Sequence, residues 1–239
     1  MKKIRNPFRH LNKFDWTLWI CSLAAVIVSF FAVGSTDWLT LVTSVIGVTS
    51  LIFAAKGDFF GLILMLAFSI IYAIVSLFFH YYGETITYLV MEFPTCLVSL
   101  INWLRHPASE DGSEVRVGRI RAKHIIIMIV LAIVIGVAFY FILRALNTEN
   151  LEVSTVSVVT SFMALYLMAL RIPAYAVMYA VNDIVLITLW ALACMQSIYY
   201  LPMMVCFAVF LINDIYGFIL WIMRSRKQKG SAPDSAEPK

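Results

Sequence analysis

The stretch HIIIMIVLAIVIGVAFYFIL, residues 124–143, contains no Asp, Glu, Lys or Arg. A helix of about 20 apolar residues is long enough to cross the hydrocarbon core of a bilayer, so this stretch predicts a membrane-spanning helix. The composition of the whole chain agrees, because 62% of its 239 residues are hydrophobic, 13% are charged and the mean hydropathy is +0.89. A soluble domain is about half apolar and about a quarter charged. The chain is therefore predicted to be an integral membrane protein.

Seven further stretches have the length and apolar character of membrane spans. Open strands cannot satisfy their backbone hydrogen bonds in lipid, and barrel strands would alternate between apolar and polar residues, which these stretches do not. The predicted fold class is therefore an all-α integral membrane protein with eight transmembrane helices. The seven additional spans are residues 16–33, 38–55, 59–79, 85–104, 153–170, 174–195 and 202–223.

The basic residues predict the orientation of these spans. With eight crossings, all but Arg144 of the 18 Lys and Arg residues fall on the side of the two termini. Lys and Arg accumulate in cytoplasmic loops, so both termini are expected to be cytoplasmic. Another number of crossings would scatter the basic residues over both sides. The loop 105–123 is then a cytoplasmic connector, and the polar residues 224–239 are expected to form a disordered cytoplasmic tail.

The first span has an alternative interpretation. The basic residues 1–13 also fit the start of a signal peptide, and Ala32-Val33-Gly34 fits its cleavage site. The apolar run is longer than is usual for a signal peptide, and Trp16 and Trp19 stand at its start. We therefore expect a retained N-terminal helix over residues 16–33.

A weak internal repeat indicates how the spans are organised. A shift of 118 residues places Tyr72 on Trp190 and Trp103 on Trp221. Apolar sequences align easily, so coincidence stays an alternative. A genuine repeat predicts two parallel three-helix units, because four crossings separate equivalent helices. The expected architecture is an extra N-terminal helix 16–33, a first repeat 38–104, a linker helix 124–143 and a second repeat 153–223.

Polar residues at membrane depth are costly and usually face a cavity or a partner. Several lie near the middle of the predicted spans, and two aromatic residues share a helical face with them: Trp190 lies seven residues after Asp183, and Tyr216 lies three after Asn213. The candidate substrate-binding residues are Tyr72, Glu92, Thr95, Asn182, Asp183, Trp190, Asn213, Asp214 and Tyr216.

Aromatic rings beside amides and carboxylates suit a flat, cationic heteroaromatic ligand that also carries hydroxyl groups. The same Asn and Asp side chains could instead hold helices together. Glu92 and Asp214 are expected to be neutral or paired with each other, because an isolated charge is rarely buried. The carboxyl groups of Glu92, Asp183 and Asp214 also raise the hypothesis that transport is coupled to protons.

Several kinds of chemistry have no support in the sequence. There is no P-loop, no H-E-x-x-H and no G-x-S-x-G motif, and the four cysteines and four histidines lack metal-ligand spacing. The basic residues cluster at helix ends and do not form a nucleic-acid-binding face. We expect no catalytic residues, no metal, no cofactor and no nucleic-acid partner.

Residues 210–221, FLINDIYGFILW, resemble the last-helix signature of PnuC transporters. The span with Asn182, Asp183 and Trp190 resembles the penultimate helix of that family, and the Lys56-Gly57 turn with Tyr72 is similar to its first repeat. The resemblance implies a SWEET-like three-one-three fold assembled as a homotrimer in the bacterial inner membrane. It implies uptake of nicotinamide riboside by facilitated diffusion, with trapping by cytoplasmic phosphorylation. The pyridinium, carboxamide and ribose of this vitamin match the groups predicted for the site.

One region departs from the family pattern. Many PnuC proteins begin the penultimate helix with a Glu-Asn-Trp-like stretch, whereas residues 171–176 here read RIPAYA. Only Tyr175 and Tyr179 keep aromatic character there, which weakens the assignment of the vitamin. The alternatives are a carrier of thiamine, riboflavin or another nucleoside, and a membrane scaffold whose polar residues only join helices.

Overall fold

A computed structural model describes residues 7–108 and 115–230 of the chain. Within these ranges the chain is helical apart from loops and one isolated bridge between Pro107 and Val115. Eight segments are long and apolar enough to cross a membrane, as predicted. They are α1 (Lys13–Ala32), α2 (Trp38–Ala55), α3 (Phe59–Phe78), the segment α4 (Tyr82–Ile86), η2 (Thr87–Glu92) and α5 (Phe93–Arg105), α6 (Ala122–Ala145), α7 (Leu151–Ala169), α8 (Ala174–Gln196) and α9 (Leu201–Gly230). Two short helices, η1 (Pro7–His10) and η3 (Ile198–Tyr200), complete the described elements.

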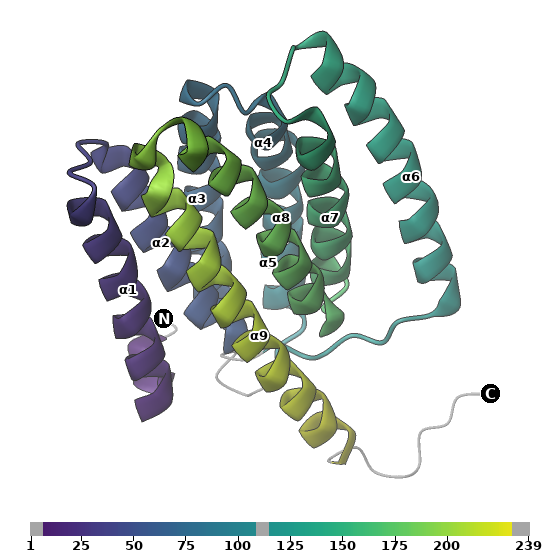
Figure 1. The fold of residues 1–239 in the computed structure, drawn as a ribbon. Coiled ribbons are helices and arrows are strands. Elements are labelled where there is room, and N and C mark those ends of the chain that lie inside the picture. Colours follow the sequence, from purple (N-terminus) through teal and green to yellow (C-terminus); the bar gives the residue numbers. More distant parts are fainter. Residues whose placement is uncertain (1–6, 109–114, 231–239) are drawn as a thin grey trace.

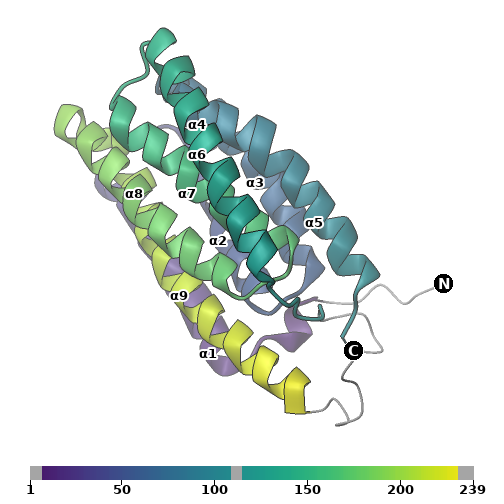
Figure 2. The ribbon, with the colours of Figure 1, turned by 90° about the vertical axis from the view of Figure 1, so that its right-hand side faces the viewer.

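The helices form a bundle with α1 and α6 on opposite flanks (Figure 1). Helix α1 packs on α2 and α9, and α6 packs mainly on α7. Helix α6 is the least buried span, with 11% of its most apolar window covered by protein, so most of its surface is left for lipid or a neighbouring chain. Figure 2, turned by 90°, shows the same helices running side by side along the bundle.

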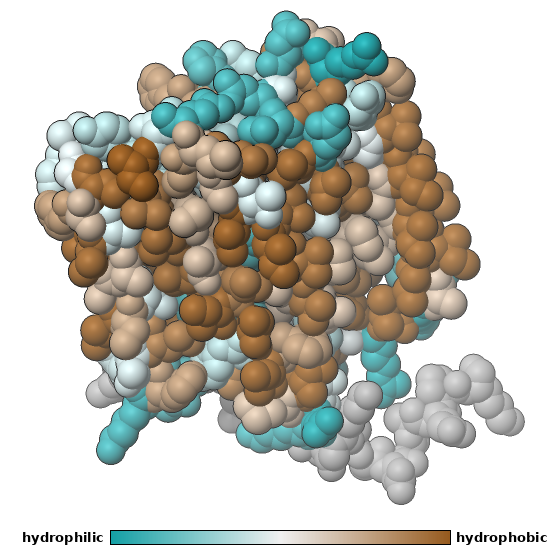
Figure 3. Space-filling model, viewed as in Figure 1, coloured by the Kyte–Doolittle hydropathy of each residue, from teal (hydrophilic) through white to brown (hydrophobic). Residues whose placement is uncertain are grey.

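The surface of the bundle is apolar around its middle and polar at its two ends (Figure 3). This distribution fits a bilayer, because apolar side chains face hydrocarbon and polar ones face water. Helix α1 begins and α9 ends at the same end of the bundle, drawn at the bottom of Figure 1. We call this the lower end and the opposite one the upper end.

A tight turn at the lower end joins α2 to α3. Gly57 has a φ of +66°, which glycine adopts at no steric cost, and the Asp58 carboxylate accepts a hydrogen bond from the Phe60 N–H at 3.0 Å. A Cβ on Gly57 would come within 2.6 Å of the Arg224 side chain. The turn therefore requires glycine for its backbone conformation, and a larger residue would also displace the end of the Arg224 side chain.

The fourth span is not a regular α-helix. Residues 87–92 form a turn of π-helix directly before Pro94. Proline has no N–H and its ring clashes with the carbonyl four residues earlier, here that of Val90, so a regular helix cannot continue through this point. Such π-turns insert an extra residue and are frequent at functional sites. The turn carries Tyr88 and Glu92, both buried in the bundle.

The last helix corrects part of the expected disordered tail, because residues 224–230 continue α9, whereas residues 231–239 of the tail lie outside the described residues. The Arg224 guanidinium lies 5.1 Å from the Trp221 ring and donates to the Lys56 carbonyl. The Gln228 side chain accepts from the Val117 N–H at 2.9 Å. These contacts and the basic residues, which suit a helix C-terminus, stabilise the extension.

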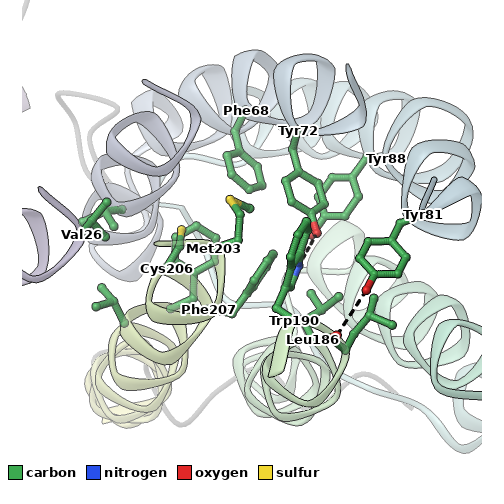
Figure 4. Close-up of a cluster of buried hydrophobic side chains, with 14 of the residues drawn as sticks. Val26, Phe68, Tyr72, Tyr81, Tyr88, Leu186, Trp190, Met203, Cys206 and Phe207 are labelled. Atoms are coloured by element: carbon green, nitrogen blue, oxygen red, sulfur yellow. Dashed lines mark hydrogen bonds between the residues drawn. The ribbon is translucent and has the colours of Figure 1, made fainter. Parts of the chain in front are cut away.

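Two aromatic clusters fill the core, one in each half of the bundle. In the upper half, Tyr72 and Trp190 are fully buried among apolar side chains from α3, η2, α8 and α9 (Figure 4). In the lower half, the Trp221 ring packs on Trp103 at 5.4 Å and on Tyr175 at 5.1 Å between ring centroids. Most of the predicted polar site residues lie between the two clusters.

Candidate substrate-binding site

A small cavity opens between the helices in the lower half of the bundle, with room for about one water molecule. Its wall is mainly apolar and aromatic, and Asp214 supplies its carboxyl group. A nucleoside requires far more space, so the helices must separate before one can enter. The lining residues are Leu51, Ala54, Ala55, Met65, Met168, Tyr175, Tyr179, Asp214 and Gly217.

Asp214 has a second acid beside it. The Asp183 carboxyl group on α8 lies within hydrogen-bonding reach of the Asp214 carboxyl group on α9. The two residues are 3% and 6% exposed, and Asp183 Oδ2 has no hydrogen-bond partner within the described protein. An ionised carboxylate only accepts hydrogen bonds, so a bond between the two groups requires a proton on one of them.

A third carboxyl group comes from the π-turn. The Tyr179 hydroxyl lies 3.4 Å from each oxygen of Glu92, and the Glu92 side chain is 2% exposed. Glu92 interacts electrostatically with Asp214. Residues 59–79, 82–104, 174–196 and 201–223 contain no Lys, Arg or His. Glu92, Asp183 and Asp214 therefore form an acidic layer, and the membrane-spanning ranges that carry it contain no basic residue.

An aromatic layer lies directly above the acidic layer. Trp190 Nε1 donates a hydrogen bond to the Tyr72 hydroxyl at 3.2 Å, and Tyr88 packs on Tyr72 with ring centroids 4.4 Å apart (Figure 4). Tyr88 also interacts electrostatically with Glu92 and Asp183, which links the two layers. The structure thus brings five of the nine predicted residues to the centre of the bundle: Tyr72, Glu92, Asp183, Trp190 and Asp214.

Two further predicted residues lie away from this centre. Asn182 points toward α7, where its Oδ1 accepts from Thr160 at 2.7 Å and from Ser161 at 3.1 Å. These bonds join α7 to α8, which is the helix-joining role that was left open for it. Thr95 lies half-buried on α5 and does not line the cavity.

Asn213 and Tyr216 face α1. The Asn213 amide donates to the Ser22 hydroxyl at 3.1 Å, and the Tyr216 hydroxyl donates to Asp15. The Asp15 carboxylate is fully buried and also pairs with the Lys56 ammonium at 2.6 Å. These side chains hold α1 on the bundle. Asn213 and Tyr216 therefore contact α1 and do not face the cavity.

Sequence reasoning missed three site candidates of this region, and it also missed a buried carboxyl group outside the cavity. Tyr175 and Tyr179, which line the cavity, are one helical turn apart at the start of α8, and that spacing was the available signal. Tyr88 was hidden in an apolar run. Glu84 lies just outside the predicted start of its span, yet it is fully buried, and its Oε1 accepts from the Ser157 hydroxyl at 2.6 Å.

Tyr81 closes the upper end of the aromatic layer. Its ring packs edge-on against Trp190 at 5.1 Å, and its hydroxyl donates to the Leu189 carbonyl. Burial raises the pKa of Tyr81 to about 12, so the hydroxyl keeps its proton and acts as a donor at physiological pH.

Eight apolar helices around a small buried site with acidic and aromatic side chains define a multi-pass membrane carrier for a small molecule. The family model of nicotinamide mononucleotide transporters matches residues 37–223, and the chain belongs to this family. The family is one of transporters, not of enzymes.

Relatives and a solved structure support this membership. The chain is 28% identical over 221 residues, 90% of its length and 82% of the relative, to the nicotinamide riboside transporter PnuC of Neisseria mucosa. It is 24% identical over 190 residues, 77% of its length and 79% of the relative, to the protein of the same name from Haemophilus influenzae. A crystal structure of the vitamin B3 transporter PnuC matches 91% of this chain and 94% of its own with a TM-score of 0.78 and 25% identity. The predicted resemblance to PnuC is confirmed, and the chain is a multi-pass bacterial membrane protein.

Proposed function

We propose that this protein carries nicotinamide riboside across the bacterial cytoplasmic membrane by facilitated diffusion. Both curated relatives are nicotinamide riboside transporters. The observation that carries the proposal is the acidic layer of Glu92, Asp183 and Asp214, with Asp214 facing a cavity lined by Tyr175 and Tyr179. A pyridinium ring is attracted both by aromatic faces and by carboxyl groups.

The charge of the site favours the riboside over the mononucleotide for which the family is named. The riboside carries one positive charge, whereas the mononucleotide adds a phosphate with about two negative charges. Residues 59–79, 82–104, 174–196 and 201–223, which surround the acidic layer, have no Lys, Arg or His to bind that phosphate. Burying it beside three carboxyl groups would cost several kcal/mol.

The same charge argument explains how uptake can be made irreversible. Phosphorylation in the cytoplasm would convert a substrate that the site accepts into a product that it rejects. The carrier then needs no energy source of its own, because the riboside gradient is maintained by its removal. We propose that this trapping drives net uptake.

The observed cavity describes a closed state of the carrier. The ring of the riboside would stack on Tyr175 and Tyr179, and its hydroxyl and carboxamide groups would bond to Glu92 and to the aspartate pair. The aromatic layer of Tyr72 and Trp190 closes the path above, and Trp103 and Trp221 close it below. Alternate opening of the two closures would move the substrate across.

Calorimetric titration of the purified protein with nicotinamide riboside, nicotinamide mononucleotide, thiamine and riboflavin tests this proposal. The riboside is expected to bind, and the mononucleotide to bind at least tenfold more weakly, which is about 1.4 kcal/mol. Tighter binding of the mononucleotide, or of another vitamin, would overturn the assignment of nicotinamide riboside as the substrate. If the folded protein binds none of the four compounds, the alternative of a membrane scaffold is favoured.

A pair of variants locates the site. Asp214→Asn removes a carboxyl group from the cavity wall and is expected to weaken riboside binding. Asp37→Asn is the matched control, because Asp37 caps α2 at the upper end and asparagine caps a helix equally well. Equal effects of both substitutions would contradict the placement of the site.

We also propose the three-one-three architecture, with residues 38–104 and 153–223 as parallel repeats, 124–143 as linker and α1 as the extra helix. Two contacts support it. Tyr72 bonds to Trp190 and Trp103 packs on Trp221, and the members of each pair are separated by the repeat length of 118 residues. Residues on a two-fold axis contact their own equivalents, so both pairs fit an axis along the bundle.

The remaining proposals concern the assembly. We propose that both termini are cytoplasmic, since nearly all of the basic residues that the structure describes lie in loops and helix ends at the lower end of the bundle. The buried contacts of Asp15 favour a retained α1 over a cleaved signal peptide. A homotrimer would cover part of the exposed α6, and native mass spectrometry of the detergent-solubilised protein tests it.

A further inference from the structure

We propose that Asp183 and Asp214 share one proton while the site holds no substrate, and that this proton leaves for water when a cationic ring binds beside Asp214. The inference rests on the proposed function and deepens it, because it assigns a charge-balancing role to one pair of residues. It concerns the binding equilibrium. The proton is taken up again when the riboside leaves, and when release and uptake occur on the same side of the membrane no net proton is transported. The substrate gradient alone then drives the carrier.

The geometry of the pair carries the first step. The two carboxyl groups are within hydrogen-bonding reach, on neighbouring helices α8 and α9, and both are more than nine-tenths buried. Two negative charges at this distance in a low-dielectric interior repel strongly, so a carboxylate pair of this kind holds a proton between its members. Asp183 Oδ2 has no partner within the described protein, so a ligand atom or water can still bond to it.

No cationic side chain among the described residues interacts with the aspartate pair to balance its negative charge. Helix α2 has no titratable side chain along its length, and α7 has none among the cavity-lining residues. From α3, Tyr72 faces the neighbouring Tyr88. The groups that interact electrostatically with one or other aspartate are Tyr88 and Glu92 of η2, Tyr175 and Tyr179 of α8, and Cys206 of α9. None of these groups is a cation, so only a proton or a cationic ligand can balance the second aspartate.

The charge balance of the site couples riboside binding to proton release. Before binding, the pair holds one proton and one negative charge. The riboside brings one positive charge to the cavity beside Asp214, and the loss of the proton restores the same net charge. Because binding and proton release are linked, the apparent affinity rises by about tenfold for each pH unit over the range in which the free pair is protonated.

Calorimetry separates this inference from the proposed function. Nicotinamide riboside is titrated into the purified protein at one pH in two buffers with different ionisation enthalpies. The difference in heat gives the number of protons exchanged, expected to be about one released per riboside. Binding without a buffer-dependent heat overturns the inference and leaves the proposed function standing. Absence of binding overturns both.

Two variants assign the proton to the pair. In Asp183→Asn the new amide donates to Asp214, which needs no proton, so riboside should bind with no proton release and with little pH dependence. Glu84→Gln removes a buried carboxyl group that bonds to Ser157 outside the cavity, and proton release should persist. Release that persists in Asp183→Asn, or that disappears in Glu84→Gln, contradicts the assignment.

An infrared measurement on the unmodified protein keeps the inference testable if a variant fails to fold. In the spectrum with riboside minus the spectrum without it, the C=O stretch of a protonated carboxyl group should give a negative band, and a carboxylate stretch should give a positive one. An unchanged carboxyl band with bound riboside would overturn the inference.

Discussion

At the residue scale, Asp15 is the polar contact on which the docking of α1 depends. Its carboxylate is fully buried, pairs with Lys56 at 2.6 Å, accepts from Tyr216 and completes a capping box with Asn12. A buried donor that loses its acceptor destabilises a protein by about 1–3 kcal/mol. The residue therefore holds together three segments that lie far apart in the chain.

Asp15→Ala is expected to lower the free energy of unfolding by about 1–3 kcal/mol, since it leaves the Tyr216 hydroxyl and the Lys56 ammonium without their acceptor. Lys56→Ala should cost less, because Tyr216 still bonds to Asp15 and the Lys56 side chain is 20% exposed. Thermal unfolding in detergent measures both variants. A larger loss for Lys56→Ala would contradict this order.

The hydrogen bond between Trp190 and Tyr72 gives a second prediction. Tyr72→Phe leaves the fully buried indole N–H without an acceptor and should cost about 1–3 kcal/mol of stability. In a Trp190→Phe background the same change should cost much less, because no donor is left unpaired. The measurement is a double-mutant cycle, which compares the unfolding free energies of the unmodified protein, the two single variants and the double variant. Equal costs in both backgrounds would exclude the bond as the cause.

The sequence could predict the depth of the polar residues but not the side they face. Counting from the ends of the spans places Asn182 and Asp183 at mid-membrane, and in the structure both lie near the middle of α8. They are adjacent in sequence and point in different directions, Asn182 to α7 and Asp183 to α9. In a multi-helix bundle each side of a helix can meet a polar neighbour, so a polar residue alone does not identify the central face.

At the scale of elements, the π-turn before Pro94 determines where Tyr88 and Glu92 lie. An extra residue in one turn rotates everything before it by about 100° relative to everything after it. The upper part of this span is therefore set against the aromatic layer independently of the lower part, which packs on α3 and α7.

Pro94→Ala restores the missing N–H and removes the clash that ends the regular helix, so we expect equal or higher thermal stability but weaker riboside binding. Binding should fall because Glu92 and Tyr88 turn away from Tyr179 and Tyr72. Pro202→Ala is the matched control, since Pro202 lies in the first turn of α9 where proline costs little. A Pro94→Ala protein that binds as the unmodified one does would refute a role for the π-turn.

Span positions were predictable to within a few residues because hydrophobic length determines them. Two exceptions have causes other than hydrophobic length. The π-turn arises from one proline inside an apolar run, which changes no hydropathy. The extension of α9 to Gly230 depends on tertiary contacts of Arg224 and Gln228 with loops far away in the sequence. Neither kind of cause can be seen in a count of apolar residues.

At the scale of the whole molecule, orientation follows from the basic residues of the lower end. A single cysteine at His106, an exposed position at that end, should react with a membrane-impermeant thiol reagent only after the cells are permeabilised. A cysteine at Thr36, exposed at the upper end, should react in intact cells. Background from the four native cysteines is measured on the unmodified protein. The reverse labelling pattern would invert the topology.

The helix α1 gives the molecule a part that the family match does not include, because the match begins at residue 37. Its contacts with Asn213 and Tyr216 occupy one face of α9, and the opposite side of that helix carries Asp214. The whole-molecule account is thus a carrier core of seven spans with α1 fixed against its last helix.

Counterflow in proteoliposomes tests the central claim most directly. Vesicles loaded with unlabelled nicotinamide riboside, without ATP or an ion gradient, are diluted into a trace of labelled riboside. The account predicts transient accumulation of label, which is lost when the internal riboside is replaced by nicotinamide mononucleotide. Absence of accumulation with riboside inside, or equal exchange with the mononucleotide, would contradict a carrier whose acidic site selects the cationic riboside.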